Sequence, residues 1–93
     1  MMKNYPFYCI HVTGIRFYEP ADKYKAELDL FIKSSKFRWV GSEMIMPNED
    51  LDLAEGNTLL KAYNIVKTIN NFAEVKSINI LRVTDLDDVK TII

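Results

Sequence analysis

The stretch from 57 to 72 has the clearest hydrophobic periodicity in this chain of 93 residues. At about 100° per residue, its apolar residues fall on one face and its lysines and asparagines on the other. Gly56 ends the preceding segment, and Asn57 or Thr58 can accept from the first free backbone N–H groups. The pattern therefore predicts one long amphipathic helix. Its apolar face is made of Leu59, Ala62, Tyr63, Val66, Ile69 and Ala73, with Ile65 and Phe72 widening it.

Residues 7–13 are rich in aromatic and β-branched side chains, which is typical of a strand. Tyr8, Ile10 and Val12 share one face of it, and the alternate residues share the other. Both faces are partly apolar, which favours a central strand over an edge strand. Gly14 interrupts the run as a bulge before residues 15–18 continue it, and Pro20 marks a turn over 19–22.

Residues 21–32 fit two different periods. We favour a strand, because the polar segment 33–36 leads straight into another strand-like run and the pair resembles a hairpin. The helical alternative places Pro20 at the first position of a helix. The strand period is Ala26, Leu28, Leu30 and Ile32, spoiled only by Phe31; the helical period is Ala21, Tyr24, Leu28, Phe31 and Ile32.

The rest of the chain completes a single α+β domain over residues 1–93. Residues 37–46 predict a third strand, and residues 75–83 a fourth. A short acidic turn over 49–55 precedes the long helix, and a short helix from 84 to about 91 ends the chain. We expect the order β-β-β-α-β, with a four-stranded, mostly antiparallel sheet and the long helix packed on one face. A helix at 21–32 would change the order to β-α-β-α-β.

Composition narrows the class of protein. Hydrophobic residues make up 48% and aromatic residues 12%, which predicts a packed globule rather than a disordered chain. We see no signal peptide and no apolar run near the roughly 18 residues of a membrane span, so we expect no membrane partner. The one cysteine, Cys9, lies in an apolar run, which favours a reducing, cytoplasmic setting.

The charge balance is nearly neutral but uneven along the chain. The net charge is −1. Residues 1–42 carry seven Lys or Arg and four acidic residues. Residues 43–93 carry five Lys or Arg and nine acidic residues. A mild polarity of this kind is common and identifies no partner.

One stretch interleaves cations with aromatic side chains. Such a surface on a sheet can stack single-stranded bases while neutralising phosphate. The alternative is that the aromatic residues are core and the lysines guard a sheet edge. The near-neutral charge and the acids Glu27 and Asp29 weaken the nucleic-acid interpretation. The candidate binding residues are Arg16, Lys36, Phe37, Arg38 and Trp39.

No pattern in the chain requires a catalytic or metal centre. Cys9 and His11 share one strand face, but no nucleophile elbow or glycine-rich turn accompanies them. Asp50 and Asp52 lie in an acidic stretch without the spacing of a calcium loop, and we favour solvated helix-initiating acids over a metal site. We therefore expect no enzyme activity, no cofactor and no metal.

The remaining candidate is a surface for a protein. The chain has many large apolar groups for so small a core, and such residues anchor interfaces. One helix covers only one side of a four-stranded sheet, so a second copy could cover the other. Our leading hypothesis is a small interaction module that self-associates, as a homodimer, and acts through a protein partner as an accessory or inhibitory factor. The alternatives are a single-stranded nucleic-acid-binding protein and, third, a small-molecule enzyme.

Overall fold

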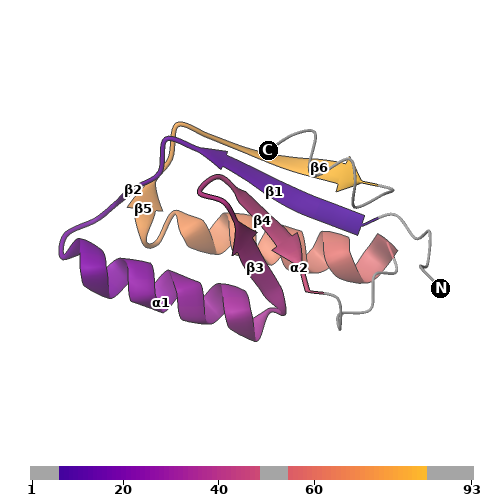
Figure 1. Cartoon of the computed structure of the whole chain (residues 1–93), viewed down its shortest axis with the longest axis horizontal. Helices are drawn as coiled ribbons and strands as arrows, with labels where there is room; N and C mark the ends of the chain where they lie inside the picture. Colours follow the sequence, from indigo (N-terminus) through magenta and orange to yellow (C-terminus); the bar gives the residue numbers. More distant parts are fainter. Residues whose placement is uncertain (1–6, 49–54, 84–93) are drawn as a thin grey trace.

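The computed structural model describes residues 7–48 and 55–83, and this part of the chain folds into two helices and six strands (Figure 1). An α+β fold is thereby confirmed. The elements in chain order are β1 (Phe7–Thr13), β2 (Arg16–Phe17), α1 (Ala21–Ser34), β3 (Phe37–Val40), β4 (Met44–Pro47), α2 (Glu55–Ile69), β5 (Ala73–Glu74) and β6 (Ser77–Val83).

The main sheet has four strands in the order β3-β4-β1-β6, and every neighbouring pair is antiparallel. The predicted four-stranded antiparallel sheet is therefore confirmed, as is the central place of β1. The long strands β1 and β6 pair along their whole length, from Phe7 opposite Val83 to Thr13 opposite Ser77. Strand order and helix placement together give the split β-α-β topology of ferredoxin-like folds.

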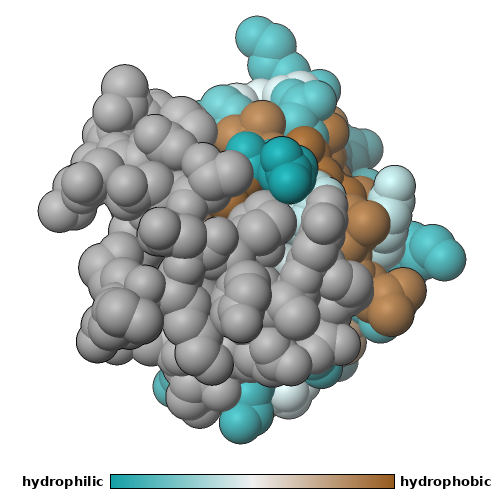
Figure 2. All heavy atoms as spheres, turned by 90° about the vertical axis from the view of Figure 1, so that its right-hand side faces the viewer, coloured by the Kyte–Doolittle hydropathy of each residue, from teal (hydrophilic) through white to brown (hydrophobic). Residues whose placement is uncertain are grey.

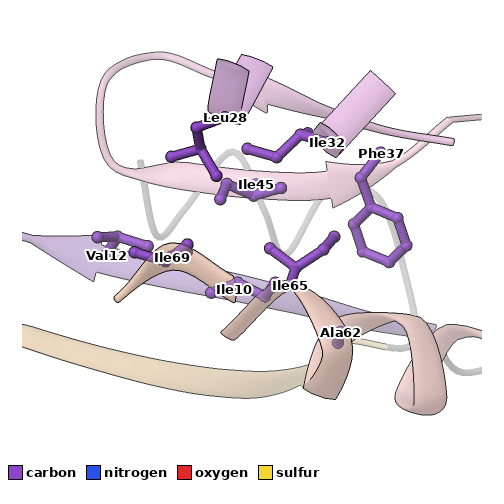
Figure 3. Packing of buried hydrophobic residues seen from close by; sticks show 9 residues of the cluster. All are labelled: Ile10, Val12, Leu28, Ile32, Phe37, Ile45, Ala62, Ile65 and Ile69. Carbon is purple, nitrogen blue, oxygen red and sulfur yellow. The ribbon is translucent and has the colours of Figure 1, made fainter. Parts of the chain in front are cut away.

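Both helices pack on the same face of the sheet, so the molecule has two layers over one core. Figure 3 shows the buried side chains of both helices and three strands converging there. Tyr8, Ile10 and Val12 turn to this face from β1, as their alternation predicts. The buried members of the core are Ile10, Val12, Leu28, Ile32, Phe37, Ile45, Ala62, Ile65 and Ile69.

The prediction of a strand at 21–32 is wrong, because α1 occupies Ala21–Ser34. Burial follows the helical period: Leu28 and Ile32 are buried, whereas Leu30, which the strand period would place beside them, is 68% exposed. Pro20 is the N-cap of α1, one position before the place that the helical alternative gave it. The segment 33–36 consequently joins a helix to a strand rather than two strands of a hairpin.

The prediction of one strand over 37–46 is also wrong. The chain turns back at residues 41–43, where Gly41 has φ of 68°, and the run becomes the hairpin β3–β4. Trp39 pairs with Ile45 and Val40 with Met44 across it. The sheet keeps four strands because this hairpin supplies the strand that α1 does not. The element order is therefore β-β-α-β-β-α-β-β in place of β-β-β-α-β.

The long helix is confirmed, but α2 spans Glu55–Ile69 instead of 57–72, so Gly56 lies inside it rather than before it, and its buried face is shifted. In α2, Thr58, Ala62, Ile65 and Ile69 are buried, so the centre of the face lies near Ile65. Tyr63 was expected to be buried but is 52% exposed. The apolar arc was wide enough to admit either orientation, and the sheet selected the one that buries the β-branched residues.

The second face of the sheet carries a separate buried cluster. It consists of the alternate residues of β1 with their neighbours on β4 and β6: Phe7, Cys9, Met44, Met46 and Val83. The expectation that both faces of the first strand are apolar is thus confirmed. These side chains are at most 5% exposed in the single chain, so this face does not offer the open apolar surface from which self-association was first inferred.

Beyond Thr13 and Ser77, the β1–β6 ribbon bends and continues as the small β2–β5 sheet. Gly14 lies at the bend with φ of 63°, in the place predicted for a bulge. A Cβ atom at this residue would lie 2.6 Å from Cβ of Lys76. The segments around Gly14 and Lys76 therefore lie too close together for any residue larger than glycine at position 14. The predicted acidic turn and terminal helix fall on 49–54 and 84–93, outside the described residues.

Candidate functional site

The candidate residues of β3 alternate between the two faces of the sheet. Phe37 and Trp39 turn toward the helices, and Phe37 is completely buried in the core. Arg38 lies opposite Met46, on the other face, and is exposed. The side chains of Phe37 and Arg38 therefore do not share a surface, and a buried phenyl ring offers no platform on which a base could stack.

Trp39 is held by α1. Its indole N–H donates a hydrogen bond to Oδ1 of Asp29 at 3.2 Å, and the ring is partly buried against the core. The sequence analysis placed Asp29 near this stretch through a hairpin; the two residues do meet, but α1 brings them together. Asp29 and Trp39 thus join the middle of α1 to the outer strand of the sheet.

Two hollows lie on either side of this contact, and both are lined by Asp29 and Trp39. The first, of about 390 Å³, extends to Phe17 of β2, Lys25 of α1 and the β3–β4 turn. The second, of about 430 Å³, extends along α1 to Leu30 and Lys33 and along β3 to Arg38. Volumes of this size are within the usual range for ligand pockets. We call the pair the Trp39 groove.

The Trp39 groove is apolar at its centre and basic at its rim. Lys25, Lys33 and Arg38 line it, and Asp29 is the only carboxylate among the described residues of its lining. Lys25 and Lys33 lie four residues either side of Asp29 on α1, yet neither forms an ion pair with any described residue. Because Asp29 accepts from the indole, the groove presents three cations against one engaged carboxylate.

The other predicted binding residues lie apart from the groove lining. The guanidinium of Arg16 donates to Oε2 of Glu74 at 2.7 Å across the β2–β5 sheet, with both side chains largely exposed. Lys36 occupies the turn between α1 and β3 with φ of 63° and accepts at its carbonyl from the N–H of Asn48. The exposed ion pair between Arg16 and Glu74 contributes at most about 1 kcal/mol to stability, so it holds the Arg16 side chain only weakly.

An aromatic cluster closes the start of α1, next to the β2–β5 sheet. The ring of Tyr24 packs edge-on against Tyr18, with centroids 6.4 Å apart, and against Phe72, at 6.2 Å. The backbone N–H of Tyr18 also donates to the carbonyl of Phe72 at 3.0 Å. These contacts hold the start of α1 against the segment between α2 and β5, to which Phe72 belongs.

Cys9 and His11 lie on the same face of β1, as their spacing predicts. Cys9 is completely buried, and this burial raises the pKa of its thiol from 9.0 to about 12. A thiol with so high a pKa is protonated at neutral pH and is a poor nucleophile. The described residues also bring together no group of three or more His, Cys, Asp or Glu side chains that could hold a metal ion.

The outer edge of β6 is the second feature of interest, and the sequence analysis did not single it out. The N–H of Val12 donates to the carbonyl of Glu43 at 2.8 Å, so the even residues of β1 bond to β4. Backbone groups alternate between the two sides of an antiparallel strand. The odd residues of β1 and β6 therefore bond to each other, and the N–H and C=O groups of Ile78 and Ile80 point outward.

No strand in the described part of the chain pairs with this outer side of β6. Asn79 and Arg82 are exposed, and β6 runs for seven residues without proline, in contrast to the four residues of β3. In Figure 1, β6 borders the sheet on the side opposite α1. The signal in the sequence is the run of β-branched and apolar residues from 77 to 83, which alternates only weakly between apolar and polar positions.

The end of the molecule that carries the starts of β1 and α2 offers a less defined surface. Figure 2 faces this end and shows exposed hydrophobic side chains beside hydrophilic ones. Leu60 and Tyr63 of α2 are 67% and 52% exposed. Neither of them lines the two hollows of the Trp39 groove. Single exposed apolar side chains of this kind are usual on a protein surface.

The helices in the described part of the chain are not long and apolar enough to cross a membrane. Comparison with known proteins finds no protein family whose model matches this chain and no curated protein that matches it.

Proposed function

We propose that this protein is a small, non-enzymatic, intracellular interaction module that self-associates and acts through a protein partner as an accessory or inhibitory factor. The observation that carries the proposal is the outer edge of β6, with which no strand in residues 7–48 and 55–83 pairs. A long strand edge with unpaired backbone groups is a template for adding another strand. Most protein sheets protect such an edge, and β6 carries few of the protecting features.

The edge is complementary to itself. If two copies of β6 pair antiparallel about a two-fold axis at Ile80, all seven residues of each strand have a partner and the outward groups of Ile78 and Ile80 are satisfied. In this register, Arg82 faces Ile78 of the second copy. The only charged residues of the two strands are then kept apart, whereas pairing about Arg82 would oppose like charges. The result is a continuous eight-stranded sheet.

The first test is the mass of the protein in solution, measured by light scattering and by sedimentation. We expect a dimer, and the variant Ile80→Pro should be a monomer. Proline removes an N–H that points outward, so the bonds between β1 and β6 remain and circular dichroism should show a folded chain. Leu81→Pro is the matched control, because it removes an inward N–H and should unfold the protein.

The register has its own test at Ile78, which faces Arg82 of the second copy. Ile78→Glu and Ile78→Lys remove the same apolar side chain, but the first brings opposite charges together and the second brings like charges together. The glutamate variant should dimerise more tightly than the lysine variant, and salt should reduce the difference. A wild-type protein that is monomeric at every soluble concentration would refute self-association; a dimer that persists in Ile80→Pro would move it to another surface.

Single-stranded nucleic-acid binding stays the alternative function. Arg38 is exposed and Trp39 is half-buried beside Lys25 and Lys33, which favours it. The burial of Phe37 removes one of the five residues on which it was based, and Arg16 lies apart from the groove, across the β2–β5 sheet from Glu74. Quenching of Trp39 fluorescence by single-stranded oligonucleotides, weakening steeply with salt, would support this alternative.

A further inference from the structure

We infer that the Trp39 groove is a docking site for an acidic segment of a protein partner, bound through large apolar side chains flanked by carboxylates. The inference rests on the groove itself and not on self-association. The groove lies at the β3 side of the sheet, at the opposite edge from β6.

The centre of the Trp39 groove is apolar. Leu30 is 68% exposed and lies at the lip of the larger hollow, beside the ring of Trp39. The ring of Trp39 lines both hollows, and Phe17 lines the smaller one. Tryptophan in a desolvated pocket is a common anchor of interfaces. Two hollows beside one indole therefore fit two apolar side chains of one bound segment.

Charge gives the sign of the partner. Lys25, Lys33 and Arg38 border the groove and form no ion pair with any described residue. The carboxylate of Asp29 is already bonded to the indole N–H. The net charge of the whole chain is only −1, yet positive charge is in local excess around the apolar centre of the groove. Such an arrangement steers and orients an acidic partner and repels a basic one.

A peptide fits these features better than a nucleic acid. Stacking requires exposed ring faces, and Phe37 is buried while Trp39 is held edge-on to α1 through its N–H. The groove is instead a pair of hollows lined by apolar side chains with cations at the rim, and such hollows accept side chains. The partner is accordingly an acidic protein segment.

The experiment uses the full chain and the fluorescence of Trp39, its only tryptophan. The probe is a short synthetic peptide that alternates glutamate with leucine, titrated at low and at near-physiological salt, with calorimetry run in parallel. Control probes are a peptide that alternates lysine with leucine, one that alternates glutamate with serine, and a single-stranded oligonucleotide. We expect saturable binding of the glutamate–leucine peptide alone, weaker at the higher salt.

Two exposed leucines make a matched pair of variants. Leu30→Ser should weaken binding of the glutamate–leucine peptide by about tenfold or more, because one buried leucine anchor is lost. Leu60→Ser, at 67% exposure on α2, should leave it unchanged. Likewise Arg38→Glu should weaken binding, and Lys67→Glu, on the last turn of α2, should not.

Three results would overturn the inference. They are the absence of binding by both methods at low salt, equal effects of the Leu30 and Leu60 variants, and tighter binding of the oligonucleotide than of the glutamate–leucine peptide. None of these results depends on the oligomeric state. If the protein is a monomer that binds the glutamate–leucine peptide, docking at the Trp39 groove is supported and self-association is refuted. If it is a dimer that does not bind the peptide, self-association is supported and docking at the groove is refuted.

Discussion

The two outer strands of the sheet are protected in different ways. At β3, the backbone of Phe37 is covered along with its side chain, and α1 lies against the strand through Asp29 and Trp39. At β6, Asn79 and Arg82 are exposed, and no described strand pairs with the outer side. Among the residues that the structure describes, a helix thus lies against the short edge strand, and no strand pairs with the outer side of the long one. Because an unpaired strand edge is a template for another strand, the proposed self-association is placed at β6 and the proposed partner site at β3.

The largest effect is expected from opening the guarded edge. Phe37→Ala removes a completely buried ring at the place where α1, α2 and β3 meet, and should lower the free energy of unfolding by about 3–5 kcal/mol. Chemical denaturation measures the change. Asn79→Ala, on the exposed part of β6, is the control and should change it by less than about 0.5 kcal/mol. Similar losses in both variants would mean that the two edges are equally guarded.

A smaller effect is expected at the bend that ends the β1–β6 ribbon. Gly14→Ala forces a Cβ atom to within 2.6 Å of Cβ of Lys76 at φ of 63°, and should cost about 1–3 kcal/mol of unfolding free energy. Gly41→Ala has a similar φ, of 68°, in the exposed β3–β4 turn, and is the matched control. The excess cost at Gly14 measures the close approach to Lys76. Equal costs would show that only the backbone conformation matters.

The smallest effect concerns the contact between α1 and β3. Asp29→Ala removes the acceptor of the Trp39 indole N–H and should reduce stability by about 1 kcal/mol, with a change in the emission of Trp39. Glu27→Ala, an exposed acid two residues earlier on the same helix, should change neither quantity. If Asp29→Ala leaves the emission as it is, the indole is held by packing and not by this hydrogen bond.

Most of the strands and one helix could be predicted from alternation and period. The two faces of β1 were predicted residue by residue, because a central strand buries both sets of alternate side chains. The helix at 21–32 was not predicted, because Leu28 and Ile32 fit both the strand period and the helical period. Only the exposure of Leu30, which the structure shows, distinguishes the two. At 37–46 the hairpin preserves the faces of a straight strand, since Trp39 and Ile45 lie opposite each other. The turn at Gly41 therefore left little trace in the pattern.

The candidate site was predicted in part. The stretch around Trp39 was singled out from its composition, but its partners on α1 were not, because a strand was expected there. A signal was present: Lys25, Asp29 and Lys33 are spaced four apart, which places them on one side of a helix. The β6 edge could not be predicted, because sequence does not say which of four strands is outermost.

The strand order has a consequence for how strongly the protein would hold a partner. In the proposed pair of copies, eight strands separate the two Trp39 grooves, a span of about 34 Å at the usual spacing between strands. A partner with two acidic segments joined by a flexible linker of about 40 residues would bridge that span on average. Its second segment would then bind at high effective concentration, so weak individual contacts would add up to strong avidity. Dissociation of the two copies would release such a partner without any change in the grooves themselves.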